Sequence, residues 1–236
     1  MGHREGRDGT MVGTVSDWTK DEVEQAVAAL RDGGLILVKG DVGYGLLGSS
    51  EAALRRLYRL KERAGTKPCG IMGTLEVLDA IAGPLDDRLR TWLGEISAKF
   101  PCAGILNVRD RSTVLTSLSP WVQEHVVQEG SVAVFLGRGQ YIEAIIRRVL
   151  DDGLLVIGSS ANVSGTGNCF SLRELPPSFL RAVDFYVDHG DARYANPDRV
   201  GTTMLDFEAW RVHRRGVNWQ EIERSMELLK AELEGK

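Results

Sequence analysis

The alternation of apolar and polar positions divides the chain into short helices and short strands. Apolar residues recur at intervals of three and four over residues 21–31, which predicts a helix with one buried face. An unbroken apolar run over residues 35–39 is typical of a buried strand, and Ser50 is a predicted N-cap of the helix that follows it. The same patterns predict further helices over residues 75–82, 85–99, 141–150 and 218–236, and further strands over residues 69–72, 105–108, 131–136, 154–157, 185–188, 203–206 and 210–213.

Strands and helices that alternate in this way favour an α/β fold, a mixed sheet flanked by helices in one domain. The chain has 236 residues, enough for one substantial core. Residues 1–15 are expected to be disordered, residues 16–217 to form the domain, and residues 218–236 to form a C-terminal helix.

Composition excludes several classes of protein. The start of the sequence is charged and lacks an apolar segment, and no run of about 18 apolar residues follows, so we expect a cytoplasmic protein with no membrane partner. Cys69, Cys102 and Cys169 are widely spaced, which argues against both disulfides and a zinc site, and the histidines are too dispersed for a metal site. We therefore expect no protein-bound metal.

Positive charge is concentrated in one short segment, although the whole chain carries a net charge of −4. Between residues 55 and 67, six basic residues stand against one acidic residue, a local charge of +5 that leaves −9 for the rest of the chain. The first three, on the helix, are expected to form a solvated face; the last three lie where the helix runs out into a loop. The six are Arg55, Arg56, Arg59, Lys61, Arg63 and Lys67.

Two small-residue loops could bring backbone N–H groups close to an anion, at residues 40–45 and 159–167. Cations for a polyphosphate would come from Lys61, Arg63 and Lys67, and directional hydrogen bonds from Ser160 and Asn162. The stretch "FLGRGQYIEAII" lacks the third glycine of a dinucleotide fingerprint, and "GSSANVSGTGN" lacks the lysine of a phosphate-binding P-loop. Nucleotide binding is the hypothesis that these residues leave open.

An ordered set of motifs carries a resemblance to a known family. The stretches are "GGLILVKGDVGYGLLGSS", "LYRLKERAGTKPCGIM", "SVAVFL", "GSSANVSG", "GTTMLD" and "VHRRGV", spread over roughly residues 20 to 217. In order and spacing they resemble the YrdC family, which includes the threonylcarbamoyl-AMP synthases of tRNA modification. The resemblance implies a twisted mixed sheet around a positively charged central cavity. It also implies a reaction in which ATP adenylates a carbamate and pyrophosphate leaves, with Mg²⁺ carried by ATP.

The resemblance assigns roles to individual residues. Lys61 and Arg63 match the K-x-R element of the family and are implied to be catalytic. The implied nucleotide contacts are Lys67, Ser160, Asn162, Thr203 and Arg214, and the implied substrate contacts at the cavity mouth are Gly40, Asp41, Val42 and Tyr44.

Departures from the family pattern point to a changed substrate. The turn after the first strand reads Lys39-Gly40-Asp41-Val42-Gly43, where the threonine enzymes carry two threonines, and Phe135 stands where an arginine is common. Losing a hydroxyl from a hydrogen-bonded site costs about 1 to 3 kcal/mol, so we expect another acceptor. The turn is more similar to that in the YrdC-like domains of HypF- and TobZ-type carbamoyltransferases, which make carbamoyl-adenylate within a longer chain. Lys39 is then a candidate catalytic cation.

Three functions stay open at this point. The favoured one is an ATP-dependent enzyme that forms a carbamoyl-type adenylate from a small carbamate or carbamoyl donor, with the module alone on this chain and a separate carbamoyl transferase as its partner. The second is a threonylcarbamoyl-AMP synthase. The third is a non-catalytic relative that binds double-stranded RNA or a protein partner, for which the basic segment would give weak, salt-dependent RNA binding.

Overall fold

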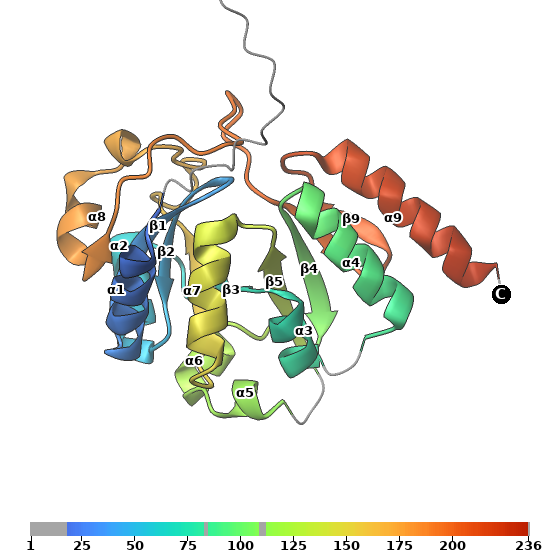
Figure 1. The fold of residues 1–236 in the computed structure, drawn as a ribbon, viewed down its shortest axis with the longest axis horizontal. Coiled ribbons are helices and arrows are strands. Elements are labelled where there is room, and N and C mark those ends of the chain that lie inside the picture. Colours follow the sequence, from blue (N-terminus) through green and yellow to red (C-terminus); the bar gives the residue numbers. More distant parts are fainter. Residues whose placement is uncertain (1–17, 83–84, 109–111, 236) are drawn as a thin grey trace, which may run out of the picture.

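The computed structural model describes residues 18–82, 85–108 and 112–235; the expected disorder of residues 1–15 lies outside them. Within these residues, nine strands form one mixed sheet (Figure 1). They are β1 (Leu35–Gly40), β2 (Gly43–Gly48), β3 (Gly70–Met72), β4 (Cys102–Asn107), β5 (Ser131–Leu136), β6 (Val156–Ser160), β7 (Phe185–Tyr186), β8 (Thr203–Asp206) and β9 (Arg211–Arg214). Their order across the sheet is β7-β1-β2-β6-β3-β5-β4-β8-β9.

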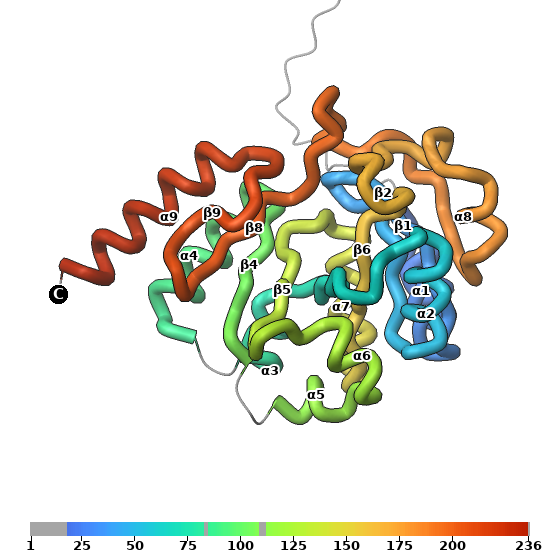
Figure 2. The backbone as a smooth tube through the Cα atoms, turned by 180° about the vertical axis from the view of Figure 1, so that it is seen from behind, coloured from blue at the N-terminus to red at the C-terminus, as the bar shows by residue number. Residues whose placement is uncertain are grey.

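Helices lie against both sides of the sheet. Figure 1 shows α1, α7, α3 and α4 in front of it, whereas the view from behind in Figure 2 brings α2 and α6 to the front. The mixed sheet flanked by helices that the sequence predicts is therefore confirmed. The helices are α1 (Lys20–Arg31), α2 (Glu51–Leu60), α3 (Leu75–Ala82), α4 (Asp87–Lys99), α5 (Thr113–Thr116), α6 (Pro120–Glu124), α7 (Gln140–Leu150), α8 (Pro177–Ala182) and α9 (Trp219–Glu234), with a 3₁₀ turn η1 (Leu172–Glu174).

Local sequence explains where several helices begin. Ser50 caps α2, as predicted, because its side chain accepts a hydrogen bond from the backbone N–H of Ala53. Thr19 and Glu22 form a reciprocal capping box at the start of α1. The apolar faces of these helices, with that of α7, bury the hydrophobic core against β1 and β2.

Strand β2 corrects the expectation of a phosphate-binding loop at residues 40–45. This segment is a hairpin: β1 and β2 pair along their whole length, and β2 also pairs with β6. Of the glycines in this segment, Gly43 is required by its backbone and its packing, because its φ is 137° and a Cβ on it would lie 2.8 Å from the Cys169 carbonyl oxygen. Most backbone N–H and C=O groups of this segment therefore form hydrogen bonds within the sheet and are not available to an anion.

Two other strands have boundaries that the pattern did not indicate. β4 starts at Cys102 rather than at residue 105. The pattern did not indicate this start because the first residues of β4 are small and do not alternate in hydrophobicity. β6 runs to Ser160 rather than ending at residue 157, since Ser159 and Ser160 pair with β2 despite their polarity. The second shift places the expected Ser-Ala-Asn motif at the end of a strand.

The sheet coils so strongly that its two halves meet. The backbone N–H of Asp41, in the β1–β2 turn, donates to the Arg138 carbonyl just after β5 at 3.0 Å, although three strands separate β1 from β5 in the sheet. The turn therefore lies against the start of α7. This contact brings together residues that both the turn and the β5–α7 connection supply.

Helix α9 packs against α4 rather than extending away from the domain. The Trp92 indole N–H donates to the Ser225 hydroxyl at 2.8 Å, and Ile222, Met226 and Leu229 are buried. The predicted C-terminal helix is thus part of the same packed body. In the described part of the chain, no helix has the length and apolar character that crossing a membrane requires.

Candidate functional site

Lys61 follows the last residue of α2, and its side chain is directed into the protein. The residue is 1% exposed. Its ammonium group donates to the Ser160 carbonyl, to the Asn162 carbonyl at 2.7 Å and to the Asn162 side-chain oxygen at 3.1 Å. Three acceptors match the three N–H bonds of a charged lysine. The K-x-R and Ser-Ala-Asn motifs, about 100 residues apart in sequence, therefore meet at this ammonium group.

Asn162 orients Lys61. Its side-chain oxygen accepts from both the Lys61 ammonium and the Ser160 hydroxyl, the latter at 2.5 Å, and its amide nitrogen donates to the Val163 carbonyl at 2.7 Å. The backbone is fixed as well, because the Ala161 N–H donates to the Tyr44 carbonyl at 2.7 Å. Ser160 and Asn162 thus hold Lys61 in this structure, which is a positioning role.

The other half of the K-x-R element lies in the turn after α2. The Arg63 guanidinium donates to the Lys67 carbonyl at 3.2 Å and to the Pro68 carbonyl at 2.5 Å, and it lies 5.8 Å from the centre of the Tyr58 ring. Lys67 itself is exposed. The turn is therefore closed by its own carbonyl groups and leaves the Lys67 charge toward solvent.

Two arginines from elsewhere in the fold are linked through Thr202. Arg214, at the end of β9, donates to the Thr202 carbonyl at 3.0 and 3.3 Å. Arg138, after β5, donates to the Thr202 hydroxyl, and its Nε atom is buried without a hydrogen-bond partner. Sequence reasoning missed Arg138; the G-R-G sequence between β5 and α7 was the available signal.

Burial and, to a smaller extent, neighbouring cations lower the pKa values of Lys61, Arg138 and Arg214. Burial lowers the pKa of Lys61 to about 7, and the nearby Arg63 and Lys67 charges act in the same direction. Burial lowers the pKa of Arg138 to about 10; Asp41 opposes this change and Arg214 adds to it. The pKa of Arg214 is lowered mainly by desolvation of its guanidinium and then by the charge of Arg63. The residue as a whole is nevertheless exposed.

Among the described residues, none of these basic side chains lies within ion-pair distance of a carboxylate, whereas most arginines on the surface do. Cations without a carboxylate at ion-pair distance favour an anionic ligand, because an anion would relieve their mutual repulsion. We call Lys61, Arg63, Arg138 and Arg214 the cation cluster.

A cavity of about 560 Å³ lies at the β1–β2 turn. Lys39, Gly40 and Asp41 line it, together with Arg138 and the start of α7. The Lys39 ammonium donates to the His189 carbonyl, and Asp41 lies 3.8 Å from Arg193. Three of the expected substrate-binding or catalytic residues therefore share a cavity, and Arg138 connects it with the cation cluster.

Three expected contacts are buried and have other partners. Val42 is 0% exposed, and the Tyr44 hydroxyl donates to the Gly190 carbonyl at 3.0 Å and to Asp188 at 3.2 Å. Thr203 is also 0% exposed: its hydroxyl donates to the Val217 carbonyl at 2.7 Å and accepts from the Gly216 N–H at 3.1 Å. Their side chains stabilise the fold here, so their expected contacts with substrate or nucleotide have no support in their positions. No local pattern in the sequence indicates this burial.

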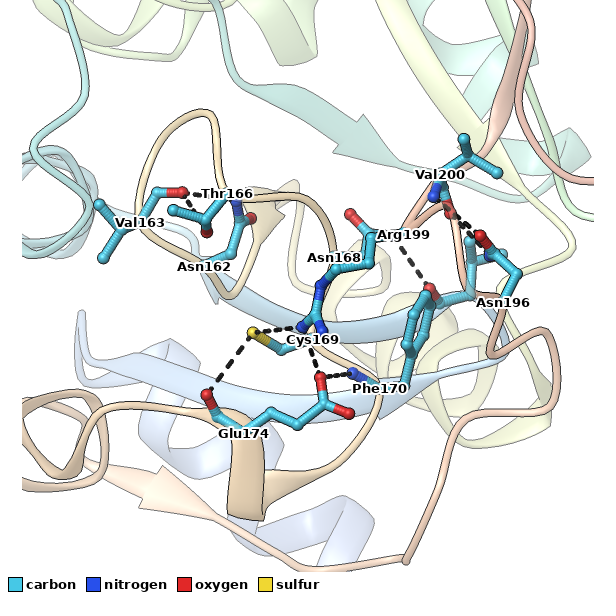
Figure 3. A network of polar contacts seen from close by, with 11 residues as sticks. Asn162, Val163, Thr166, Asn168, Cys169, Phe170, Glu174, Asn196, Arg199 and Val200 are labelled. Carbon is cyan, nitrogen blue, oxygen red and sulfur yellow. Dashed lines mark hydrogen bonds and ion pairs between the residues drawn. The ribbon is translucent and has the colours of Figure 1, made fainter.

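A polar network links side chains and backbone groups of residues 162–200, the segment that follows β6 (Figure 3). Arg199 donates to Glu174 at 2.6 Å, and Glu174 accepts from the Phe170 N–H at 3.1 Å. The same segment is tied to β2, because the Asn168 amide donates to the Val42 carbonyl and the Tyr44 N–H to the Cys169 carbonyl, both at 3.0 Å. The network supports the strand from which Ser160 and Asn162 emerge.

Comparison with known families gives one match across most of the chain. The Sua5/YciO/YrdC family, whose description is telomere recombination, matches residues 28–216. This range contains every residue of the cation cluster. No curated protein sequence matches the chain significantly.

Solved structures share the fold at low sequence identity. P. abyssi Sua5 complexed with L-threonine superimposes with a TM-score of 0.68 at 20% identity, over 86% of this chain and 56% of Sua5. E. coli YciO gives 0.65 at 18% identity, over 84% of this chain and 91% of YciO. Full-length HypF in its phosphate- and nucleotide-bound form gives 0.60 at 16% identity, over 79% of this chain and 27% of HypF. The chain thus spans little more than half of Sua5.

Proposed function

The chain belongs to the Sua5/YciO/YrdC family, and we propose that it is an ATP-dependent enzyme that forms a carbamoyl-type adenylate and releases pyrophosphate. The product would be carbamoyl-AMP or the adenylate of an N-carbamoyl amine. The observation that carries this proposal is the cation cluster. Lys61 is held by the Ser-Ala-Asn backbone beside Arg63, and neither cation has a carboxylate partner among the described residues.

The proposed reaction needs neutralised charge and alignment more than it needs a nucleophilic side chain. A carbamate oxygen attacks the α-phosphorus of ATP, a P–O bond forms, and the bond to the β-phosphate oxygen breaks as pyrophosphate leaves. Lys61, Arg63 and Arg214 would offset the charge on the phosphates. The described residues contain no group of three His, Cys, Asp or Glu side chains that could hold a metal, so we propose that Mg²⁺ arrives bound to ATP.

The β1–β2 turn favours a substrate other than threonine. The turn presents Gly40 and Val42 in place of hydroxyl side chains, and Val42 is completely buried. Lys39 and Asp41 instead line the adjoining cavity. A small carbamate, without a side chain that needs hydroxyl partners, suits such a turn better than threonine does.

A second candidate is L-threonylcarbamoyl-AMP synthesis for tRNA modification. The structural likeness to Sua5 in complex with L-threonine favours it. In either case the adenylate is an activated intermediate, and we propose that a separate transferase consumes it.

The experiment that separates these candidates measures pyrophosphate release with Mg-ATP. We expect release with bicarbonate and ammonium, which form carbamate, or with carbamoyl phosphate, which gives carbamate and phosphate on hydrolysis. We expect little release with bicarbonate and threonine. Rapid formation of threonylcarbamoyl-AMP would establish the second candidate instead. Arg63→Ala should weaken ATP binding in calorimetry, because it removes a charge-assisted contact, whereas Arg59→Ala, on the solvated face of α2, is the matched control. Absence of ATP binding at millimolar concentration would contradict both candidates.

A further inference from the structure

Arg138 is held in place by two glycines with left-handed backbone conformations. Gly137 has φ 62° and Gly139 has φ 102°. A Cβ on Gly137 would lie 2.4 Å from the Ser97 carbonyl oxygen, and one on Gly139 would lie 2.7 Å from a carboxylate oxygen of Asp41. Only glycine fits both positions without rearrangement. The backbone therefore fixes where the Arg138 side chain starts, between the end of β5 and the start of α7.

Arg138 has fewer partners than a buried guanidinium normally has. The residue is 9% exposed, and the Thr202 hydroxyl is the acceptor of one of its N–H groups. Its Nε atom is buried without a hydrogen-bond partner, and its guanidinium carbon lies 5.9 Å from the centre of the Phe135 ring. A guanidinium offers five N–H donors in a planar fork, and a buried donor without a partner costs about 1 to 3 kcal/mol. An arginine with several N–H donors left unpaired is suited to binding an oxyanion.

The position of Arg138 indicates where that anion would lie relative to the proposed ATP site. Arg138 lines the 560 Å³ cavity with Lys39 and Asp41. On its other side it shares Thr202 with Arg214, since the Thr202 hydroxyl accepts from Arg138 and the carbonyl from Arg214. Thr202 is 3% exposed, so this connection is shielded from water. Arg138 thus stands between an open cavity and the proposed polyphosphate site.

We propose that Arg138 binds the anionic group of the second substrate at this boundary, the carboxylate of a carbamate or the phosphate of carbamoyl phosphate, with Thr202 as the residue that positions it. This assignment rests on the proposed function and names the residue that selects its small anionic substrate. Phe135 stands where an arginine is common in the family that the sequence resembles. Arg138, three residues further along the chain, places its guanidinium beside the Phe135 ring and so supplies a positive charge to the same region. Arg138 would hold two oxygens of that group by two parallel N–H bonds, in reach of the nucleotide that the rest of the cluster holds.

The test is calorimetric titration with carbamoyl phosphate, with and without a saturating ATP analogue that has a methylene group between its α- and β-phosphates. Arg138→Gln should weaken carbamoyl phosphate binding about tenfold or more, through loss of charge-assisted bonds, and change analogue affinity less than about twofold. Arg138→Lys should lose nearly as much, because a lysine cannot bond in a fork. Thr202→Val, which keeps the shape and removes the positioning hydroxyl, should give a smaller loss, about threefold to fivefold.

Arg173→Gln is the matched control, an exposed arginine outside the cavity lining that pairs with Asp191 at 3.1 Å, and it should bind like the wild type. If Arg138→Gln fails to fold, Arg138→Lys and Thr202→Val still decide the question. Unchanged carbamoyl phosphate affinity in the folded variants overturns the assignment, as does an equal loss of analogue affinity, which would place Arg138 at the nucleotide. If the wild type binds no analogue, the proposed function fails, while the titration without analogue still tests Arg138.

Discussion

The two halves of the basic segment carry similar charge and have opposite environments. On α2, Arg55 pairs with Glu51 at 2.7 Å and lies 4.3 Å from the centre of the Trp121 ring, and its side chain is 46% exposed. Arg56 pairs with Asp184 at 2.8 Å. After the helix ends, Lys61 is 1% exposed and has only uncharged oxygen acceptors. Arg55 and Arg56 are neutralised at the surface, whereas Lys61 is kept without a counter-charge inside.

This difference shows why charge density alone does not locate a site. An exposed ion pair contributes about 0 to 1 kcal/mol and can be lost at little cost. A buried cation without a carboxylate is expensive to desolvate, and it persists only where fixed dipoles surround it. The carbonyls of Ser160 and Asn162 supply those dipoles to Lys61. Each prediction below tests whether the buried half is the one that binds.

The largest effect is expected for Lys61→Met. Removing the ammonium leaves its buried oxygen acceptors without a donor, which should lower the free energy of unfolding by roughly 3 kcal/mol and the midpoint of thermal unfolding by about 6 to 12 °C. ATP affinity measured on the folded variant should fall about tenfold to 100-fold. A variant with wild-type ATP affinity would show that the buried cation is structural alone.

The pH dependence of stability should give the next largest effect. Below pH 7 Lys61 is protonated in both states, so the cost of burying its charge is fully present. Between a native pKa of about 7 and the ordinary value of 10.5, the unfolded chain binds more protons. The wild type should therefore gain stability relative to Lys61→Met as pH rises, by at most about 1.4 kcal/mol per pH unit.

Urea denaturation of both proteins at pH 7 and pH 9 measures this change, because other titrating groups contribute equally and cancel in the difference. Parallel profiles would mean that the carbonyl acceptors keep the native pKa of Lys61 near its ordinary value.

The sequence predicted most elements of the fold because their patterns are local. The apolar periodicity gives α1 and α7 within one residue, and Ser50 marks the start of α2. The family that the ordered motifs indicated is confirmed by the match over residues 28–216. The hairpin partner β2 could not be predicted, because three of its six residues are glycines, which are rare in strands, and the close contacts of Gly43 with Cys169 and of Gly48 with Ala53 depend on the folded structure.

The candidate site was predictable only in its local motifs. Lys61 and Arg63 are two residues apart, so their spacing could be recognised. Arg138 is unlike them: it becomes relevant only because the coiled sheet brings the end of β5 to the β1–β2 turn and to Thr202. Burial of Tyr44 and Thr203 likewise depends on partners more than ten residues away, Gly190 and Val217. Such long-range contacts leave no periodic signal in the sequence.

Lys39→Met should give a moderate effect on activity and almost none on stability. Lys39 lines the cavity, is partly exposed and donates to a single backbone carbonyl, so the thermal midpoint should change by less than about 2 °C. Loss of its charge near an anionic carbamate should lower the rate of pyrophosphate release about tenfold, which corresponds to about 1.4 kcal/mol in the transition state. Full activity would remove Lys39 from the proposed site and weaken the case for a carbamoyl substrate.

The smallest effect is expected for Arg55→Gln, on the neutralised half of the segment. The substitution removes the ion pair with Glu51 and most of the contact with Trp121, and it should lower the free energy of unfolding by about 0.5 to 1 kcal/mol. ATP affinity should change less than about twofold at 0.15 M salt, because this charge is exposed and screened. Calorimetry at 0.05 and 0.3 M salt measures both the affinity and its salt dependence. A loss comparable with that of Lys61→Met would show that the whole basic segment attracts the ligand, and that burial of Lys61 does not set it apart.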